Sequence, residues 1–144
     1  MKLLLDIDSL NNDFFEDTRL LGITAPIKNY KFCWQLNNLL GYSFRLNPEI
    51  EIHLRRKNRN YYFSVYESLE QNSFLVHYLY HNHFDGEYLL PEFKHMDFLW
   101  LMKGDIIDPE KCDKIKQSIR GIGGVQMVAE LTNEKIKNKG NMVF

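Results

Sequence analysis

Residues 96–102 form a run that is apolar at every position except Asp97. A strand buried on both faces has such a near-continuous apolar sequence, whereas a half-exposed strand alternates. Asp108 followed by Pro109 then predicts the start of a helix, because aspartate is a good N-cap and proline suits the first helical position. Glycines within 121–124 end that helix, and residues 125–131 alternate as a strand. The sequence therefore predicts a β-α-β unit whose first strand lies centrally in a sheet.

The rest of the chain supplies one more helix and several short strands. Apolar residues between 27 and 40 recur at helical spacing, and Gly41 follows where a helix commonly ends. Between residues 43 and 90 the apolar period is mostly two, which predicts four or five meandering strands. We expect an α+β fold with a single, mostly antiparallel sheet and two main helices on one face. A ferredoxin-like core with an added hairpin satisfies this order.

Length and charge narrow the class of protein. With 144 residues the chain has the size of one ordinary domain, so we expect residues 1–144 to form a single domain. Its 18 basic and 19 acidic side chains give a net charge of −1, so no global positive field favours nucleic acid. The apolar run at residues 3–5 is too short for a signal peptide, and no run is long enough to span a membrane. These features predict a cytoplasmic protein that has no membrane partner.

Three histidines, His77, His81 and His83, fall on positions of the same parity close to Asp85. On one strand they would share a face, and neutral imidazole is a common metal ligand. His77 and His81 would lie about 13 Å apart on an extended strand, so one ion cannot easily join both. The compact metal candidate is therefore His81, His83 and Asp85. The alternative is a half-exposed polar face.

A basic stretch precedes an aromatic one in the middle of the chain. Basic residues beside strand aromatics are how an RNA-recognition sheet binds phosphates and stacks bases. The competing interpretation is a charged hairpin tip whose aromatic residues lie in the core or at a subunit interface. The slightly acidic chain makes nucleic acid the less favoured partner. The residues concerned are Arg55, Arg56, Lys57 and Arg59, followed by Tyr61, Tyr62 and Phe63.

The segment 90–98 carries the most distinctive motif. Its residues are Leu90, Pro91, Glu92, Met96, Asp97 and Phe98. The motif resembles the signature of the IPExxxVDY family, with Pro91, Glu92 and Asp97 identical and the others conservatively replaced. The resemblance implies a small cytoplasmic protein of Bacteroidota with no assigned activity.

Two roles are open for the motif carboxylates. Glu92 and Asp97 can accept backbone N–H groups across the turn at residues 93–95. Alternatively, they form a carboxylate pair that faces a pocket or a partner.

Tyrosines on the predicted strands suggest association. Tyrosine is favoured where an apolar surface keeps a polar tip, as at protein interfaces. The interface candidates are Tyr61, Tyr66, Tyr78 and Tyr80. We therefore expect a non-enzymatic, homo-oligomeric interaction or regulatory protein, a homodimer or a partner of another protein. The alternatives are a small-molecule or metal-binding module and an RNA-binding sheet. The sequence predicts no catalytic residue, because Cys33 and Cys112 lie on apolar helix faces and no Gly-x-Ser-x-Gly motif is present. It also predicts no cofactor.

Overall fold

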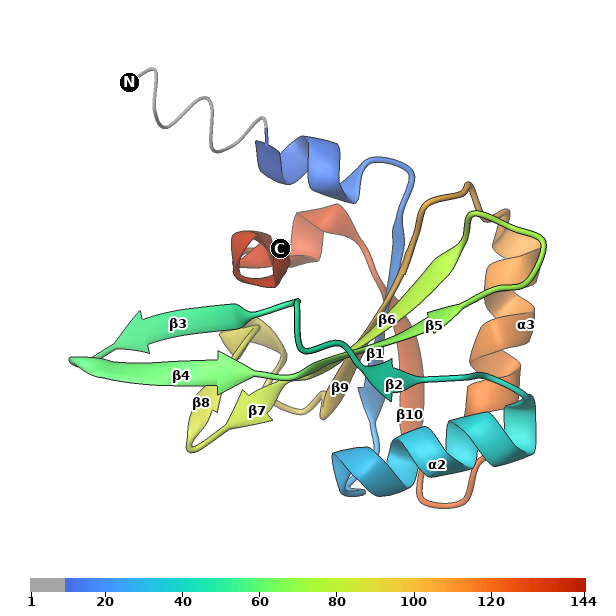
Figure 1. The fold of residues 1–144 in the computed structure, drawn as a ribbon, viewed down its shortest axis with the longest axis horizontal. Helices are drawn as coiled ribbons and strands as arrows, with labels where there is room; N and C mark the ends of the chain where they lie inside the picture. Colours follow the sequence, from blue (N-terminus) through green and yellow to red (C-terminus); the bar gives the residue numbers. More distant parts are fainter. Residues whose placement is uncertain (1–9) are drawn as a thin grey trace.

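The computed structural model describes residues 10–144, which form an α+β fold around a six-stranded antiparallel sheet. Two main helices and two small hairpins accompany the sheet (Figure 1). The strands are, in spatial order, β10 (Met127–Leu131), β1 (Arg19–Thr24), β9 (Phe98–Lys103), β6 (Val76–His81), β5 (Val65–Leu69) and β2 (Arg45–Leu46). The predicted α+β class and the antiparallel sheet are confirmed.

Strand β9 occupies the centre of this sheet, between β1 and β6, as its apolar sequence predicts. Its first five residues are all buried. Strands β9 and β10 both run antiparallel to β1, so they are parallel to one another and the helix between them completes the predicted β-α-β unit. The strand begins at Phe98 rather than at residue 96 because Met96 closes a turn by donating its N–H to Phe93 O at 2.9 Å.

The helices α2 (Asn29–Leu40) and α3 (Pro109–Arg120) both bury one side against the sheet. Asp108 caps α3 as predicted, accepting the Lys111 N–H at 2.8 Å. Gly41 ends α2 in the left-handed conformation, φ 80°. Helix α2 starts two residues later than the spacing predicts, because Lys28 is still extended.

One buried cluster joins both helices to one face of the sheet, and a second cluster covers the opposite face. The first contains Phe32, Cys33 and Leu36 of α2, Cys112, Ile115 and Ile119 of α3, and Leu21, Leu79, Phe98, Trp100, Met102 and Val128 of the sheet. The second joins Leu20, Tyr80, Leu99 and Leu101 to the inner side of the hairpin formed by β3 (Ile52–Arg56) and β4 (Arg59–Phe63). Both faces of the sheet are therefore covered by the chain itself.

The remaining elements are short. They are β7 (His83–Phe84), β8 (Glu87–Tyr88), and the 3-10 turns η1 (Pro91–Phe93), η2 (Asn133–Lys135) and η3 (Lys139–Met142). The polar, acidic sequence of residues 10–17 suggests a loop, but residues 10–15 are helical, and Phe15 packs into the second buried cluster. No helix within residues 10–144 is long and apolar enough to cross a membrane. The predicted absence of a signal peptide, which depends on residues 3–5, lies outside the described residues.

Candidate functional site

The family-like motif folds into a turn organised by a buried amide, Asn82. This side chain is fully buried; its Nδ2 donates to Phe93 O at 3.0 Å and to Met96 O at 2.9 Å. Its Oδ1 accepts the Leu90 N–H at 2.7 Å. All three of these side-chain hydrogen bonds therefore serve the backbone of residues 90–96.

The two motif carboxylates accept backbone N–H groups, but from distant segments rather than across the turn at 93–95. Glu92 Oε2 accepts from the N–H groups of Lys137 and Asn138, at 2.5 and 2.7 Å. Asp97 Oδ2 accepts from the Ala25 N–H at 2.7 Å. The carboxylates are thus bonded to separate parts of the chain, and the interpretation of them as one pair facing a pocket finds no support in these contacts.

Glu92 holds the C-terminal segment, and its removal should loosen that segment. Burial alone would raise the pKa of Glu92, but its bonds to Asn138 and Lys137 lower it overall. We expect Glu92→Ala to speed amide hydrogen exchange at Lys137 and Asn138 and to lower the free energy of unfolding by about 1 kcal/mol. The exposed Glu49→Ala variant serves as control; unchanged exchange at residues 137 and 138 would contradict this role.

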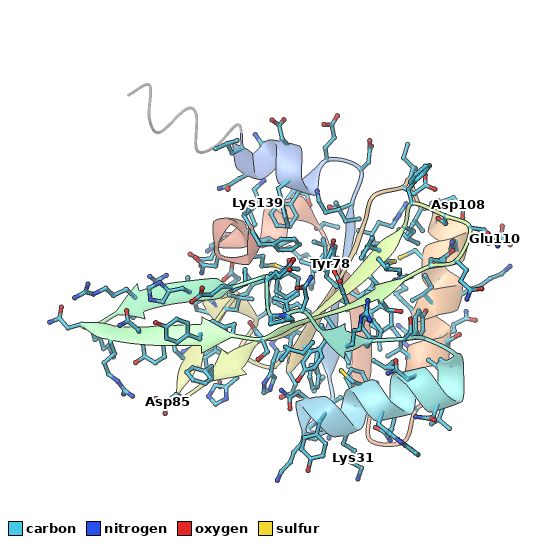
Figure 2. The ribbon with its side chains drawn as sticks, in the orientation of Figure 1. Lys31, Tyr78, Asp85, Asp108, Glu110 and Lys139 are labelled. Carbon is cyan, nitrogen blue, oxygen red and sulfur yellow. The ribbon has the colours of Figure 1, made fainter. Side chains whose placement is uncertain are left out.

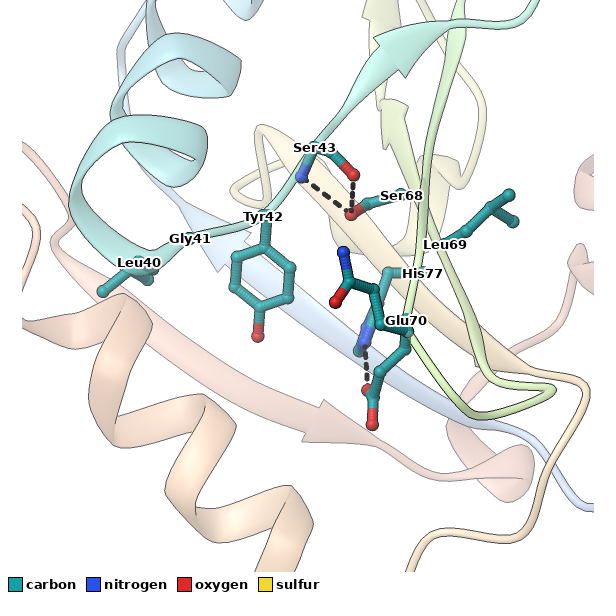
Figure 3. Close-up of a pocket in the computed structure, with 9 residues that line it drawn as sticks. Leu40, Gly41, Tyr42, Ser43, Ser68, Leu69, Glu70 and His77 are labelled. Carbon is teal, nitrogen blue, oxygen red and sulfur yellow. Dashed lines mark hydrogen bonds and ion pairs between the residues drawn. The ribbon is translucent and has the colours of Figure 1, made fainter.

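A pocket of about 520 Å³ lies where the C-terminal end of α2 meets the end of β5 (Figure 3). Its lining includes Tyr42, Ser43, Ser68, Glu70 and His77. The Ser43 N–H donates to Ser68 Oγ at 3.0 Å, which joins the segment between α2 and β2 to β5. The polar groups at the back of the pocket are bonded to one another, as the dashed lines in Figure 3 show.

His77 is locked in one neutral tautomer at the back of this pocket. Trp100 Nε1–H, which can only donate, points at His77 Nδ1 at 3.0 Å. His77 Nε2 therefore carries the proton and donates it to Glu70 Oε2 at 3.2 Å, while Lys111 Nζ donates to Glu70 Oε1 at 2.7 Å. Both ring nitrogens are thus engaged, so His77 has no free lone pair with which to accept a proton from a ligand.

The charges around His77 favour this neutral state. Burial lowers the pKa of His77, and the bond to Glu70 offsets only part of that effect. Burial would raise the pKa of Glu70, but the bonds from Lys111 and His77 lower it overall. Burial, with the Glu70 charge, raises the pKa of Tyr42 to about 12. At neutral pH the pocket therefore presents a carboxylate paired with an ammonium, beside a neutral imidazole and a neutral phenol.

Acid should weaken the fold through His77. Its pKa is lowered in the folded state, so below an unfolded-state pKa of about 6.5 the unfolded chain binds a proton that the native chain does not. Stability is therefore complete above that pH and falls as the pH falls toward the native pKa. We expect the wild type to lose more stability than His77→Gln between about pH 7.5 and about pH 5.5, measured by urea unfolding. An equal loss in both proteins would contradict the locked neutral histidine.

The metal candidates do not gather around one point. His81 stacks on Phe98 with ring centroids 5.2 Å apart, and His83 lies against Tyr88 on a separate hairpin. Asp85 is paired with Arg59 at 2.6 Å. Across the part of the chain that the structure describes, no group of three or more His, Cys, Asp or Glu side chains could hold a metal ion.

The interface prediction is wrong for two of its four tyrosines, because these two lie inside the molecule. Tyr61 is 5% exposed and Tyr80 is 0% exposed, and the Tyr80 hydroxyl donates to Met142 O at 3.0 Å. The prediction failed because the β3–β4 hairpin and the C-terminal turns cover the second face of the sheet. Tyr66 and Tyr78 are half-buried at the margins of the two clusters, and Tyr78 packs edge-to-face on Phe144.

The β3–β4 hairpin extends beyond the body of the molecule, and residues 55–60 at its end are all exposed (Figure 1). Lys57 and Asn58 both have positive φ, 53° and 61°, as a tight two-residue hairpin turn requires. Arg59 pairs with Asp85 of the neighbouring β7–β8 hairpin. Within residues 10–144 no carboxylate lies within ion-pair distance of Arg55, Arg56 or Lys57.

The two faces of this hairpin differ. Its inner face buries Ile52, Leu54, Tyr61 and Phe63, so two of the three aromatic residues of the predicted RNA-binding sheet are in the core. On the outer face the rings of His53 and Tyr62 stack at a centroid distance of 4.9 Å and an interplanar angle of 18°. Asn60 Oδ1 is bonded to His53 Nε2 at 2.8 Å on the same face.

Comparison with known proteins adds no family or function. No family model matches the chain, and no curated protein matches it either.

Proposed function

We propose that this chain is a non-enzymatic binding protein that uses the β3–β4 hairpin to bind a negatively charged partner. The observation that carries the proposal is the basic tip, where Arg55, Arg56 and Lys57 stand exposed without a counter-charge from the described residues. A monomer gains nothing in stability from exposed like charges held together at a tight turn, since neighbouring like charges repel. A partner that brings negative charge would relieve that repulsion.

Heparin affinity chromatography tests this proposal. A protein of pI about 6.5 and net charge −1 has no overall reason to be retained at neutral pH, so retention requires a local basic surface. We expect the wild type to be retained at low salt and the Arg55→Glu/Arg56→Glu variant to flow through. The matched control is Lys28→Glu/Lys31→Glu, which makes the same change in net charge at two exposed sites outside the hairpin. Equal elution of the two double variants would contradict the proposal.

Self-association, the expected homodimer, is the second candidate. Tyr30 and Trp34 lie one turn apart on α2 and are 66% and 61% exposed. Large adjacent aromatic side chains on a surface are typical of protein interfaces. We expect light scattering at micromolar concentration to give twice the chain mass of 17.2 kDa, and Trp34→Glu to give the chain mass. A wild type that scatters as a single 17.2 kDa species would contradict the homodimer.

We also propose a more specific fold, a family and a cellular location for this chain. We assign β10-β1-β9-β6, with α2 after β1 and α3 after β9, to a ferredoxin-like core to which β5, β2 and the small hairpins are added. Two observations support the assignment: in the sheet β1 and β9 lie between β10 and β6, and along the chain a helix follows each of these two inner strands. Membership of the IPExxxVDY family is proposed on the motif at residues 90–98, and a cytoplasmic location on the composition of the chain.

A further inference from the structure

We infer that the partner of the β3–β4 hairpin is single-stranded RNA, held by phosphate contacts at the basic tip and by a base stacked on Tyr62. This inference rests on the proposed function, because it names the partner of the same surface. It differs from the RNA-binding sheet that the sequence suggests, since the bases would meet the outer face of a two-stranded hairpin and not the central sheet.

The charge distribution favours a partner with a small footprint. The segment 52–63 holds four of the 18 basic side chains and none of the 19 acidic ones. Because the net charge of the whole chain is −1, the net charge of the residues outside this segment is −5. A long duplex lying along the molecule would meet this acidic body, whereas a flexible single strand can contact the projecting tip alone.

The outer face of the hairpin offers a stacking platform next to the basic residues. Tyr62 is 48% exposed, and its ring orientation is fixed by the stacked ring of His53. Arg55 and Asn60 are register partners, two positions along from the His53–Tyr62 pair toward the tip, so they share that face. A base on the Tyr62 ring would therefore place its neighbouring phosphates close to Arg55 and the tip.

The polar groups on this face suit ribose. The Tyr62 hydroxyl and the Asn60 amide stand on the same side of the hairpin as the exposed ring. Both can hydrogen-bond a 2′-hydroxyl, the group by which proteins distinguish RNA from DNA. This surface is also preorganised, because the two-residue turn at Lys57 and Asn58 fixes the hairpin before a partner binds.

Fluorescence anisotropy with a labelled oligouridine of about twelve nucleotides tests the inference across a series of salt concentrations. Arg55→Glu/Arg56→Glu should weaken binding about 100-fold or more and make the log–log salt slope shallower by about 1.4, at about 0.7 for each phosphate that the variant no longer neutralises. Tyr62→Leu should weaken binding about tenfold and leave the slope unchanged, because stacking releases no counterions. Circular dichroism and thermal unfolding confirm that each variant is folded.

Controls separate the inference from the proposed function. Lys28→Glu/Lys31→Glu should bind RNA within about twofold of the wild type, allowing for weak long-range repulsion. Lys31 points to solvent from α2 (Figure 2). Oligodeoxyuridine of the same length should bind more weakly than oligouridine. Equal binding of both oligonucleotides, or no RNA binding at low salt, would overturn the RNA assignment. If anionic phosphatidylserine vesicles then bind and Arg55→Glu/Arg56→Glu abolishes that binding, the hairpin proposal stands with a lipid partner. If neither the oligonucleotides nor the vesicles depend on the hairpin for binding, the RNA inference and the hairpin proposal both fail.

Discussion

Replacing Asn82 by leucine is expected to lower the free energy of unfolding by at least about 3 kcal/mol. Leucine has a similar volume, but it removes the two bonds to Phe93 O and Met96 O and the bond from the Leu90 N–H. The Met96 O and the Leu90 N–H would lose the partner that the described residues give them, beside a side chain that is 0% exposed, whereas Phe93 O would keep the Met96 N–H. An unpaired buried polar group costs about 1–3 kcal/mol.

Urea unfolding followed by circular dichroism measures this effect. The control is Asn38→Ala, because Asn38 is exposed on α2 and its one side-chain bond among the described residues is to Trp34 O. We expect the control to lie within about 0.5 kcal/mol of the wild type. If Asn82→Leu were as stable as the control, the amide would not organise the motif turn.

The second large effect is expected at Gly104, which follows the central strand β9. Its φ is +102°, a conformation that residues with a side chain rarely adopt, and an added Cβ would overlap the Phe74 carbonyl oxygen. The obstacle is backbone, so it cannot move aside as the end of a flexible side chain can. We expect Gly104→Ala to lower the free energy of unfolding by about 3 kcal/mol or more.

Gly123 provides the matched comparison, because an added Cβ there meets nothing within 4 Å. We expect Gly123→Ala to unfold at a urea concentration close to that of the wild type. Gly104→Ala should instead unfold at much lower urea, or fail to accumulate as folded protein. A Gly104→Ala protein with wild-type stability would show that the approach of the chain at Phe74 and Gly104 is not tight.

Local signals in the sequence predicted the elements that depend on neighbouring residues. The cap at Asp108, the left-handed Gly41 and the central position of β9 all follow from short-range chemistry or from a run of apolar residues. Helix α2 shows the limit of that reasoning. Its apolar positions are too many for one buried face, so Leu36 is buried while Tyr30 and Trp34 face solvent.

The candidate sites depend on contacts between distant residues, which a single sequence does not show. Parity correctly places His77 and His81 on one face of β6, where they pack on Trp100 and Phe98. It cannot show that Trp100 fixes the His77 tautomer. Asn82 looks like an ordinary turn residue, because the backbone groups that it binds lie up to 14 residues away. Glu92 and its partner Asn138 are separated by 46 residues.

The basic stretch was visible in the sequence, and only the fold shows which of its neighbours are accessible. Alternation along β4 buries Tyr61 and Phe63 and exposes Tyr62, but the sequence does not say which parity faces the core. The charged hairpin tip that the sequence suggests is present, but its turn type is hard to foresee, since Lys57 is an uncommon residue at positive φ. Structure therefore changes the RNA hypothesis from a sheet surface to a projecting tip.

The most direct test of the central claim, that the β3–β4 hairpin binds single-stranded RNA, is a titration of ¹⁵N-labelled protein with oligouridine, followed by amide chemical shifts. The claim predicts that the shifts that move belong to His53–Tyr62 and to residues next to them, such as Asp85. Shifts that gather around Tyr42 and Glu70 in the pocket, or no shifts at low salt, would contradict it.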